Sequence, residues 1–220
     1  MKEPETLTAA AQSAVVVVDH PLVQHKLGML RDDSTPTHLF RELVDEVTLL
    51  LTYEATKALA TEEVEIETPL ERTTVQRISG KKVAVCPILR AGLGMLDGVL
   101  SLISGARVGF IGLYRNEETL QPVEYYVKLP ADVAERDVIL LDPMLATGNS
   151  TAAAVTTVKR AGATSVRLIA IIAAPEGIER LHSEHPDVNV VVAAVDRGLN
   201  EKGYIVPGLG DAGDRLFGTK

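Results

Sequence analysis

The strongest constraint on the fold is an alternation that begins at residue 82. Short apolar runs that end at Gly, Pro or Asp are followed by stretches with helical periodicity, a pattern typical of βαβ units. Only 4% of the 220 residues are aromatic and none is Trp, so aliphatic side chains must fill the core, as in strands covered on both faces. The sequence therefore predicts an α/β fold with a parallel five-stranded core sheet flanked by helices. The expected strands are residues 83–89, 108–113, 138–141, 166–173 and 188–195, and the expected helices are residues 92–103, 150–161 and 176–185.

The N-terminal part of the chain adds elements to this core. Apolar residues recur at helical spacing over residues 36–60, which predicts a helix or helix pair with Thr35 as the N-cap and Pro36 in the first turn. Alternating Glu and aliphatic residues at 63–67 predict a short strand that belongs to a flap or an extra hairpin. Residues 1–19 are expected to form an N-terminal extension.

Two further segments suggest that the core is covered on one side. Residues 114–127 form a long polar excursion between two expected elements, which is typical of a functional flap. Residues 196–220 are rich in Gly, which permits unusual backbone torsions and a close approach to a ligand, so a hood is expected there. The simplest organisation is one domain over residues 1–220.

Charge and cysteine content restrict the partners. The net charge is −8 and no basic run is present, so we expect no nucleic-acid partner. Cys86 is the only cysteine, which excludes intrachain disulfides and fits a reducing compartment. No basic segment precedes the apolar stretch near the N-terminus, and the apolar runs are too short to cross a bilayer. We therefore expect a cytoplasmic protein with no membrane partner.

The segment from Val138 to Ser150 carries the clearest chemical signal. An apolar strand ends at the acidic Asp142, and a short turn leads into a helical stretch. The first N–H groups of a helix are unpaired and bind phosphate. Thr147 and Ser150 add hydroxyl donors, Gly148 lets the backbone approach the ligand, and Asp142 can accept hydrogen bonds from sugar hydroxyls. A phosphorylated ribose fits both ends. The P-loop spacing is absent, and the alternative is an ordinary turn with a Ser N-cap.

This segment, DPMLATGNS, resembles the ribose-phosphate loop of the type I phosphoribosyltransferases, in the form found in the uracil phosphoribosyltransferases. Other blocks resemble the same family in the same order, so the resemblance covers residues 20–220. These blocks are HPLV at 20–23, LTYEA at 51–55, CPILRAGLGM at 86–95, GLYRNEET at 112–119, AAPEGI at 173–178 and GYIVPGLGDAGDR at 203–215.

The resemblance implies roles for matching residues. The loop would hold the ribose and 5′-phosphate of phosphoribosyl pyrophosphate (PRPP). Its residues are Asp142, Pro143, Met144, Leu145, Ala146, Thr147, Gly148, Asn149 and Ser150. Arg90 and Arg115 would bind the pyrophosphate, since guanidinium groups suit phosphate oxygens. The alternatives are a surface ion pair for Arg90 and a solvated loop charge for Arg115.

The Gly-rich tail resembles the family's uracil pocket. Backbone groups of Ile205, Gly210 and Ala212 would read the polar edge of the base, with Asp211 beside them. The resemblance also places Asp211 near the ribose and the magnesium ion that PRPP carries, without a side-chain cluster that holds metal directly. The alternative for Asp211 is a turn-forming role.

The resemblance implies a catalyst that converts uracil and PRPP to UMP and diphosphate in pyrimidine salvage, with Arg115, Asp142 and Asp211 as catalytic residues. It also implies a homo-oligomer, a dimer or tetramer, and GTP as an activator in some members. One departure is Asn149, where the family's loop has Gly. Two alternatives stay open, namely a pyrimidine-nucleotide sensor that binds RNA without catalysis, and activity toward another base.

Overall fold

The computed structural model describes residues 15–80, 83–115 and 122–219. Its main sheet confirms the predicted parallel core. The strand order is β1 (Val15–Val17), β11 (Asn189–Val195), β10 (Ser165–Ala173), β8 (Asp137–Leu141), β4 (Val83–Leu89), β6 (Phe110–Arg115) and β7 (Pro122–Lys128). All neighbours along this path are parallel except β6 and β7. Two short strands complete it, β5 (Arg107–Val108) beside β4 and β9 (Met144–Leu145) beside β10.

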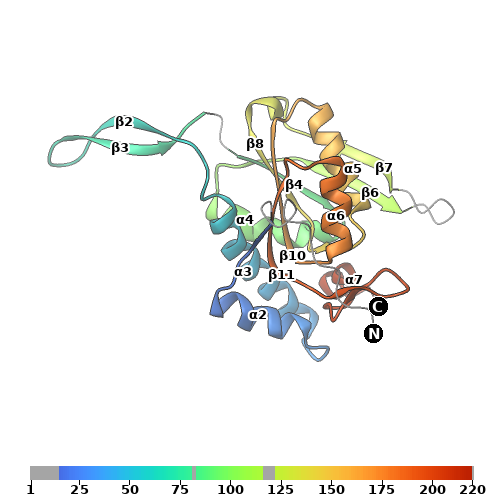
Figure 1. Ribbon diagram of the computed structural model, residues 1–220. Coiled ribbons are helices and arrows are strands. Elements are labelled where there is room, and N and C mark those ends of the chain that lie inside the picture. The colour runs from blue at the N-terminus through green and yellow to red at the C-terminus, as the bar shows by residue number, and fades with distance from the viewer. Residues whose placement is uncertain (1–14, 81–82, 116–121, 220) are drawn as a thin grey trace.

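Helices cover both faces of this sheet (Figure 1). One face carries α2 (Pro21–Arg31), α3 (Thr37–Ala55), the short 3₁₀ helix η1 (Ala91–Met95), α4 (Leu96–Leu102) and α7 (Ala212–Phe217), and the other carries α5 (Asn149–Arg160) and α6 (Pro175–Glu184). The 3₁₀ helix η2 (Val133–Glu135) precedes β8. In β8, Ile139 and Leu141 join one core while Val138 and Leu140 join the other. Both cores bury the strand, which explains its continuous apolar run. Within the described residues, no helix is long and apolar enough to cross a membrane.

The N-terminal elements differ from the prediction in three ways. The predicted extension at residues 1–19 includes β1, which pairs with β11. The sequence pattern did not predict α2. The helix expected at residues 36–60 ends at Ala55, and its N-cap is Pro36, not Thr35. The Thr35 hydroxyl donates instead to the carbonyl of Met29 at 2.6 Å, because α2 brings that carbonyl within reach.

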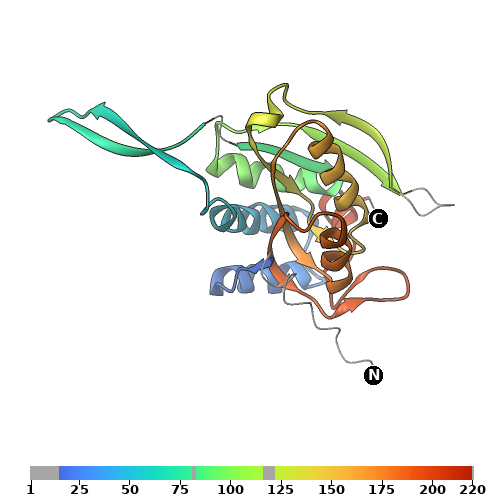
Figure 2. The same cartoon turned by 45° about the horizontal axis from the view of Figure 1, so that its top comes forward.

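The strand expected at residues 63–67 belongs to a long hairpin. Strands β2 (Thr61–Glu67) and β3 (Arg72–Ile78) pair with each other and form a separate two-stranded sheet. This hairpin, called the arm below, projects away from the body in both ribbon views (Figures 1 and 2).

The flap and hood predicted from the sequence fall on two hairpins. Strands β6 and β7 form an antiparallel hairpin at the sheet edge, and its tip, residues 116–121, lies outside the described residues. Strands β12 (Gly198–Leu199) and β13 (Ile205–Val206) form a second hairpin that precedes α7.

Candidate functional site

The Asp142–Ser150 loop has the strand–turn–helix geometry that the sequence predicts. Strand β8 ends at Leu141, and α5 begins at Asn149. Gly148 is the N-cap residue with a φ of 76°, and a Cβ at this position would lie 2.5 Å from the carbonyl oxygen of Gly177. Only Gly fits this left-handed, crowded position. No side chain caps the helix, so a turn with a Ser N-cap is not what is observed. The first N–H groups of α5 therefore remain available to an anion.

Asp142 lies between the strand and this helix. One carboxylate oxygen accepts a hydrogen bond from the Met144 N–H at 3.3 Å, and the other accepts from the Thr151 hydroxyl at 3.2 Å. Burial raises the pKa of Asp142 to about 6, against the lowering effect of these two hydrogen bonds. The carboxyl group is thus close to its titration point in the neutral range.

A pocket of about 230 Å³ joins the loop to the Gly-rich tail. It is lined by Ala91, Asp142, Pro143, Met144 and Ala146 from the core and by Gly203, Tyr204, Asp211, Ala212 and Gly213 from the tail. The pocket lies at the carboxyl ends of the parallel strands, where open α/β sheets bind ligands. Residues about 60 positions apart in the sequence therefore face one cavity.

Several predicted site residues do not line this pocket, namely residues 145, 147–150, 205 and 210. Leu145 is fully buried in the core, so only its backbone is available to a ligand. Ile205 is also buried, and Gly210 is exposed. Gly210 and Asp211 line a second pocket on the other side of the tail, together with Asp214.

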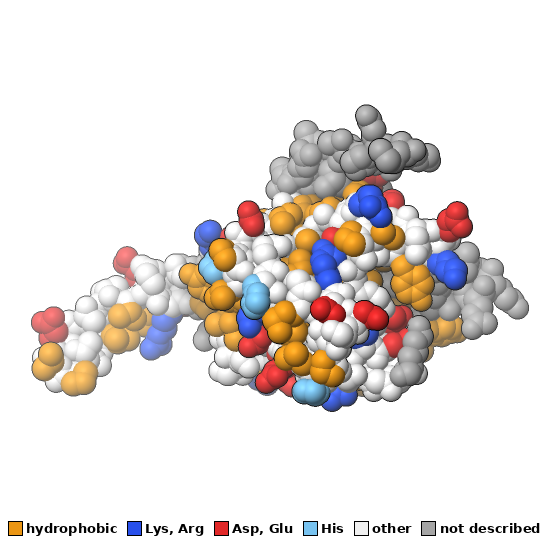
Figure 3. Space-filling view, turned by 90° about the horizontal axis from the view of Figure 1, so that it is seen from below, with side chains coloured by type: hydrophobic (Ala, Val, Ile, Leu, Met, Phe, Trp, Pro, Cys, Tyr) orange, Lys and Arg blue, Asp and Glu red, His pale blue; other side chains and the backbone are white. Residues whose placement is uncertain are grey.

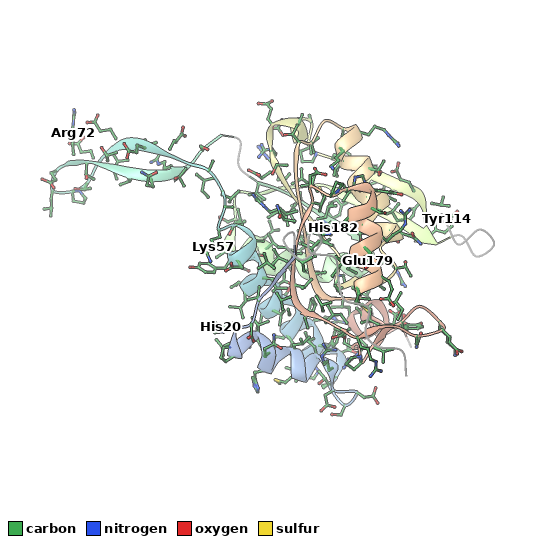
Figure 4. The ribbon with its side chains drawn as sticks, in the orientation of Figure 1. His20, Lys57, Arg72, Tyr114, Glu179 and His182 are labelled. Atoms are coloured by element: carbon green, nitrogen blue, oxygen red, sulfur yellow. The ribbon has the colours of Figure 1, made fainter. Side chains whose placement is uncertain are left out.

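Arg90 directly follows β4 and is exposed. It lines a cavity of about 260 Å³ with Leu89, Leu93, Tyr125 and Phe217. Arg115 is the last residue of β6, and its side chain lies outside the described part of the structure. Its neighbour Tyr114, at the flap end of the molecule in Figure 4, packs against Tyr125 with a ring-centroid distance of 6.2 Å.

The side chain of Asp211 caps α7. One carboxylate oxygen accepts from the Asp214 N–H at 2.9 Å, as expected for an N-cap residue. The turn-forming alternative is thus part of its role, and Asp211 also lines the 230 Å³ pocket. The two functions are compatible because a carboxylate has a second oxygen.

Several residues that the sequence pattern did not single out contact the site. Thr151 donates to Asp142. Arg180 of α6 donates from Nε to the Asn149 side-chain oxygen at 2.9 Å. Because Nε is a donor, this bond orients the Asn149 amide group with its NH₂ away from Arg180. Thr151 is the third residue of α5, so the helix-start signal in the sequence could have placed it beside the Asp142 loop. No local signal connects Arg180 to Asn149.

Neither a cysteine nucleophile nor a metal site held by side chains is supported among the described residues. Cys86 is fully buried in β4, and burial raises the pKa of its thiol to about 12, so it is not a nucleophile near neutral pH. No group of three or more His, Cys, Asp or Glu side chains in the described residues is placed to hold a metal ion.

Comparisons with known proteins agree with this geometry. A family model described as uracil phosphoribosyltransferase matches residues 17–219. A uracil phosphoribosyltransferase from Clostridium botulinum (strain Eklund 17B / Type B) is 62% identical over 208 residues, which are 94% of this chain and 100% of that protein. One from Thermoanaerobacter sp. (strain X514) is 59% identical over 94% of this chain and 98% of its own length.

Solved structures share this fold. The AQ2163 protein from Aquifex aeolicus is 40% identical, has a TM-score of 0.88, and matches over 92% of this chain and 97% of that chain. An adenine phosphoribosyltransferase from Trypanosoma brucei, at 14% identity and a TM-score of 0.58 over 86% of both chains, shares the fold. Since the family model spans most of the sequence and the curated relatives match over almost their whole length, the chain belongs to the uracil phosphoribosyltransferase family.

Proposed function

We propose that this protein transfers the phosphoribosyl group of PRPP to uracil, giving UMP and diphosphate. The observation that carries the proposal is the pocket in which the Asp142 loop faces the 203–213 tail. One side is the loop that leads into α5, whose first N–H groups carry no side-chain cap and suit a phosphate, and the other is the tail, whose backbone polar groups suit a base. The curated relatives are named as enzymes, which favours catalysis over the sensor alternative. Basic side chains on the described face in Figure 3 are scattered among acidic and apolar ones, which also favours a small-molecule substrate.

The protein's contribution to the reaction is positioning and electrostatics. Displacement at the anomeric carbon develops positive charge on the ribose and negative charge on the leaving diphosphate. Asp142, when ionised, holds the ribose hydroxyls and favours the positive charge. Arg90 and Arg115 bind the diphosphate oxygens. The flap that contains Arg115 excludes water, which would otherwise hydrolyse PRPP.

The base is read by the backbone of the tail. Ile205, Gly210 and Ala212 offer main-chain groups to the carbonyls and N–H groups of uracil. Cytosine presents an amino group where uracil has a carbonyl, so a fixed main-chain donor would face another donor there. The unpaired buried groups would reject cytosine.

Magnesium enters with PRPP in this proposal. Mg²⁺ is commonly held by one or two carboxylates together with substrate phosphates, and the lining of the pocket by Asp142 and Asp211 fits that donor set. When bound, the ion neutralises charge on the leaving diphosphate. Asp211 is the residue proposed to orient it, through the carboxylate oxygen that does not cap α7.

The assembly is proposed to be a homo-oligomer, a dimer or tetramer, in the cytoplasm. The arm supports this proposal because it packs little against its own chain. Leu70, between its two strands, is 95% exposed, and Arg72 lies near the same tip in Figure 4. Sedimentation velocity of the full chain tests the assembly, and GTP added to the activity assay tests activation.

The decisive experiment is an assay of diphosphate release from PRPP. Release that requires both uracil and Mg²⁺, with UMP as the second product, is the expected result. Uracil, cytosine, hypoxanthine and orotate are tested side by side. Preference for another base would overturn the uracil assignment, and no release with any base would overturn catalysis.

A further inference from the structure

A partly buried ion pair lies beneath the Gly-rich tail. Arg31, the last residue of α2, binds Asp196, which directly follows β11. Nη1 of Arg31 is 2.8 Å from one Asp196 oxygen, and Nη2 is 2.5 Å from the other. The Asp196 side chain is only 4% exposed. This planar, two-bond geometry is the strongest arrangement of an arginine and a carboxylate.

The same two side chains bind both the N–H and the carbonyl of Gly208. The Gly208 N–H donates to Asp196 at 2.9 Å, and its carbonyl accepts from Nη1 of Arg31 at 2.7 Å. Gly208 has a φ of 68°, and a Cβ there would lie 2.2 Å from the carbonyl oxygen of Ile205. The turn is therefore tight, and the position of Gly208 fixes that of Ile205. Ile205 is one of the residues proposed to read the base.

A second guanidinium holds the next residue of the tail. Arg215 of α7 donates from Nη1 to the carbonyl of Leu209 at 2.8 Å and from Nη2 to the carbonyl of Asp32 at 2.6 Å. Its guanidinium carbon lies 4.3 Å from the centre of the Phe40 ring. Arg215 thus ties the segment just before Gly210 to the end of α2.

The tail contains both bound and unbound main-chain groups near the residues proposed to read the base, and Ile205 itself pairs with Leu199 of β12. Side chains of the protein bind the N–H and the carbonyl of Gly208 and the carbonyl of Leu209, whereas within the described residues the N–H groups of Gly210 and Ala212 donate no hydrogen bond. The bound groups lie between the reading groups in the sequence. Because Gly208 and Leu209 are held in place, the distance between Ile205 and Gly210 is held as well.

We propose that Arg31 and Asp196 are positioning residues for uracil recognition. They act through Gly208 and do not touch the base. The inference rests on the proposed function, because it assigns Ile205, Gly210 and Ala212 to the base. Hydrogen bonds weaken steeply with changes in distance and angle, so a released loop would bind uracil less tightly. The binding of PRPP, through the separate loop at Asp142–Ser150, would stay intact.

The test uses Arg31→Met, which keeps much of the side-chain volume and removes the donors, and Arg31→Lys, which keeps the charge and loses the two-bond geometry. The matched control is Arg136→Met. Arg136 makes a comparable pair with Asp132, with Nε and Nη2 each 2.8 Å from a carboxylate oxygen, just before β8 and at the opposite end of the sheet. Apparent KM values for uracil and for PRPP are measured at saturating concentrations of the other substrate.

For Arg31→Met, we expect the KM for uracil to rise about 10-fold or more, as for a loss of one or two buried hydrogen bonds, while the KM for PRPP changes less than about 2-fold. Arg31→Lys should restore part of the loss. Arg136→Met should leave both KM values near wild type. Hydrogen exchange of the peptide around Gly208 should be faster in Arg31→Met only.

Two results would overturn the proposal. One is an unchanged KM for uracil in folded Arg31→Met or, if that variant does not fold, in folded Arg31→Lys. The other is an equal rise of both KM values, which would indicate a general structural role. Failure of the proposed function itself is distinguishable, because then the wild-type protein would show no uracil-dependent release of diphosphate.

Discussion

Asp142→Asn separates the contribution of Asp142 to catalysis from its effect on stability. The native pKa of about 6 exceeds the ordinary Asp value of 3.8, so the native protein binds this proton more tightly than the unfolded chain does. Wild-type stability relative to the variant therefore falls as pH rises from about 4 to about 6 and is constant above that. The Asn oxygen can still accept one of the two hydrogen bonds. The variant should be the more stable protein at neutral pH.

The size of this effect follows from the shift. The rise of the Asp142 pKa from 3.8 to about 6 corresponds to about 3 kcal/mol above pH 7 and to roughly half of that at pH 5. Urea unfolding of both proteins at pH 5 and pH 7.5, at one protein concentration and without substrate, measures the difference. The advantage of Asp142→Asn should grow by about 1 kcal/mol between the two pH values. An advantage that is independent of pH, or that grows on acidification, would refute the reasoning.

Asp187→Asn is the control of opposite sign. A hydrogen bond from Lys159 lowers the pKa of Asp187, so the ionised carboxylate stabilises the native protein. As pH rises through the acidic range, Asp187→Asn should therefore become less stable relative to the wild type. Kinetics complete the comparison. Asp142→Asn should reduce kcat about 100-fold or more, as expected for a lost electrostatic contact to the transition state. A folded variant with wild-type kcat would remove Asp142 from the mechanism.

Three further predictions concern single positions. Arg115→Ala should lower kcat about 100-fold with little change in the urea midpoint, and wild-type turnover would count against its role. Gly177→Ala places a Cβ 2.4 Å from the carbonyl oxygen of Ala146, so it should displace the loop proposed to bind phosphate. The free energy of unfolding in urea should fall by about 1–3 kcal/mol, and the KM for PRPP should rise more than the KM for uracil. An unchanged KM for PRPP would contradict this. The Cys86 thiol should resist a disulfide reagent in the native protein and react on unfolding, because its pKa is raised to about 12; rapid labelling without urea would show that the strand is accessible.

Local patterns predicted the core of the fold. The apolar runs of β4, β8 and β10 and the turn from Leu141 to Asn149 are encoded within short windows, since burial on both faces requires continuous aliphatic residues and a left-handed turn requires Gly148. Local patterns did not predict the strand at the edge of the sheet. Strand β1 is three residues long, and its pairing with β11 depends on a partner far along the chain.

What the sequence by itself determined is therefore the parallel α/β core and the strand–turn–helix shape of the Asp142–Ser150 loop, because strand, turn and helix signals are set by neighbouring residues. Only the tertiary structure decided which side chains meet across the fold. Arg31 and Asp196 are 165 positions apart, and Asn149 accepts from Arg180 on another helix. A charged residue has the same local pattern whether it is solvated or paired, so its partner emerges only when the topology brings the two elements together.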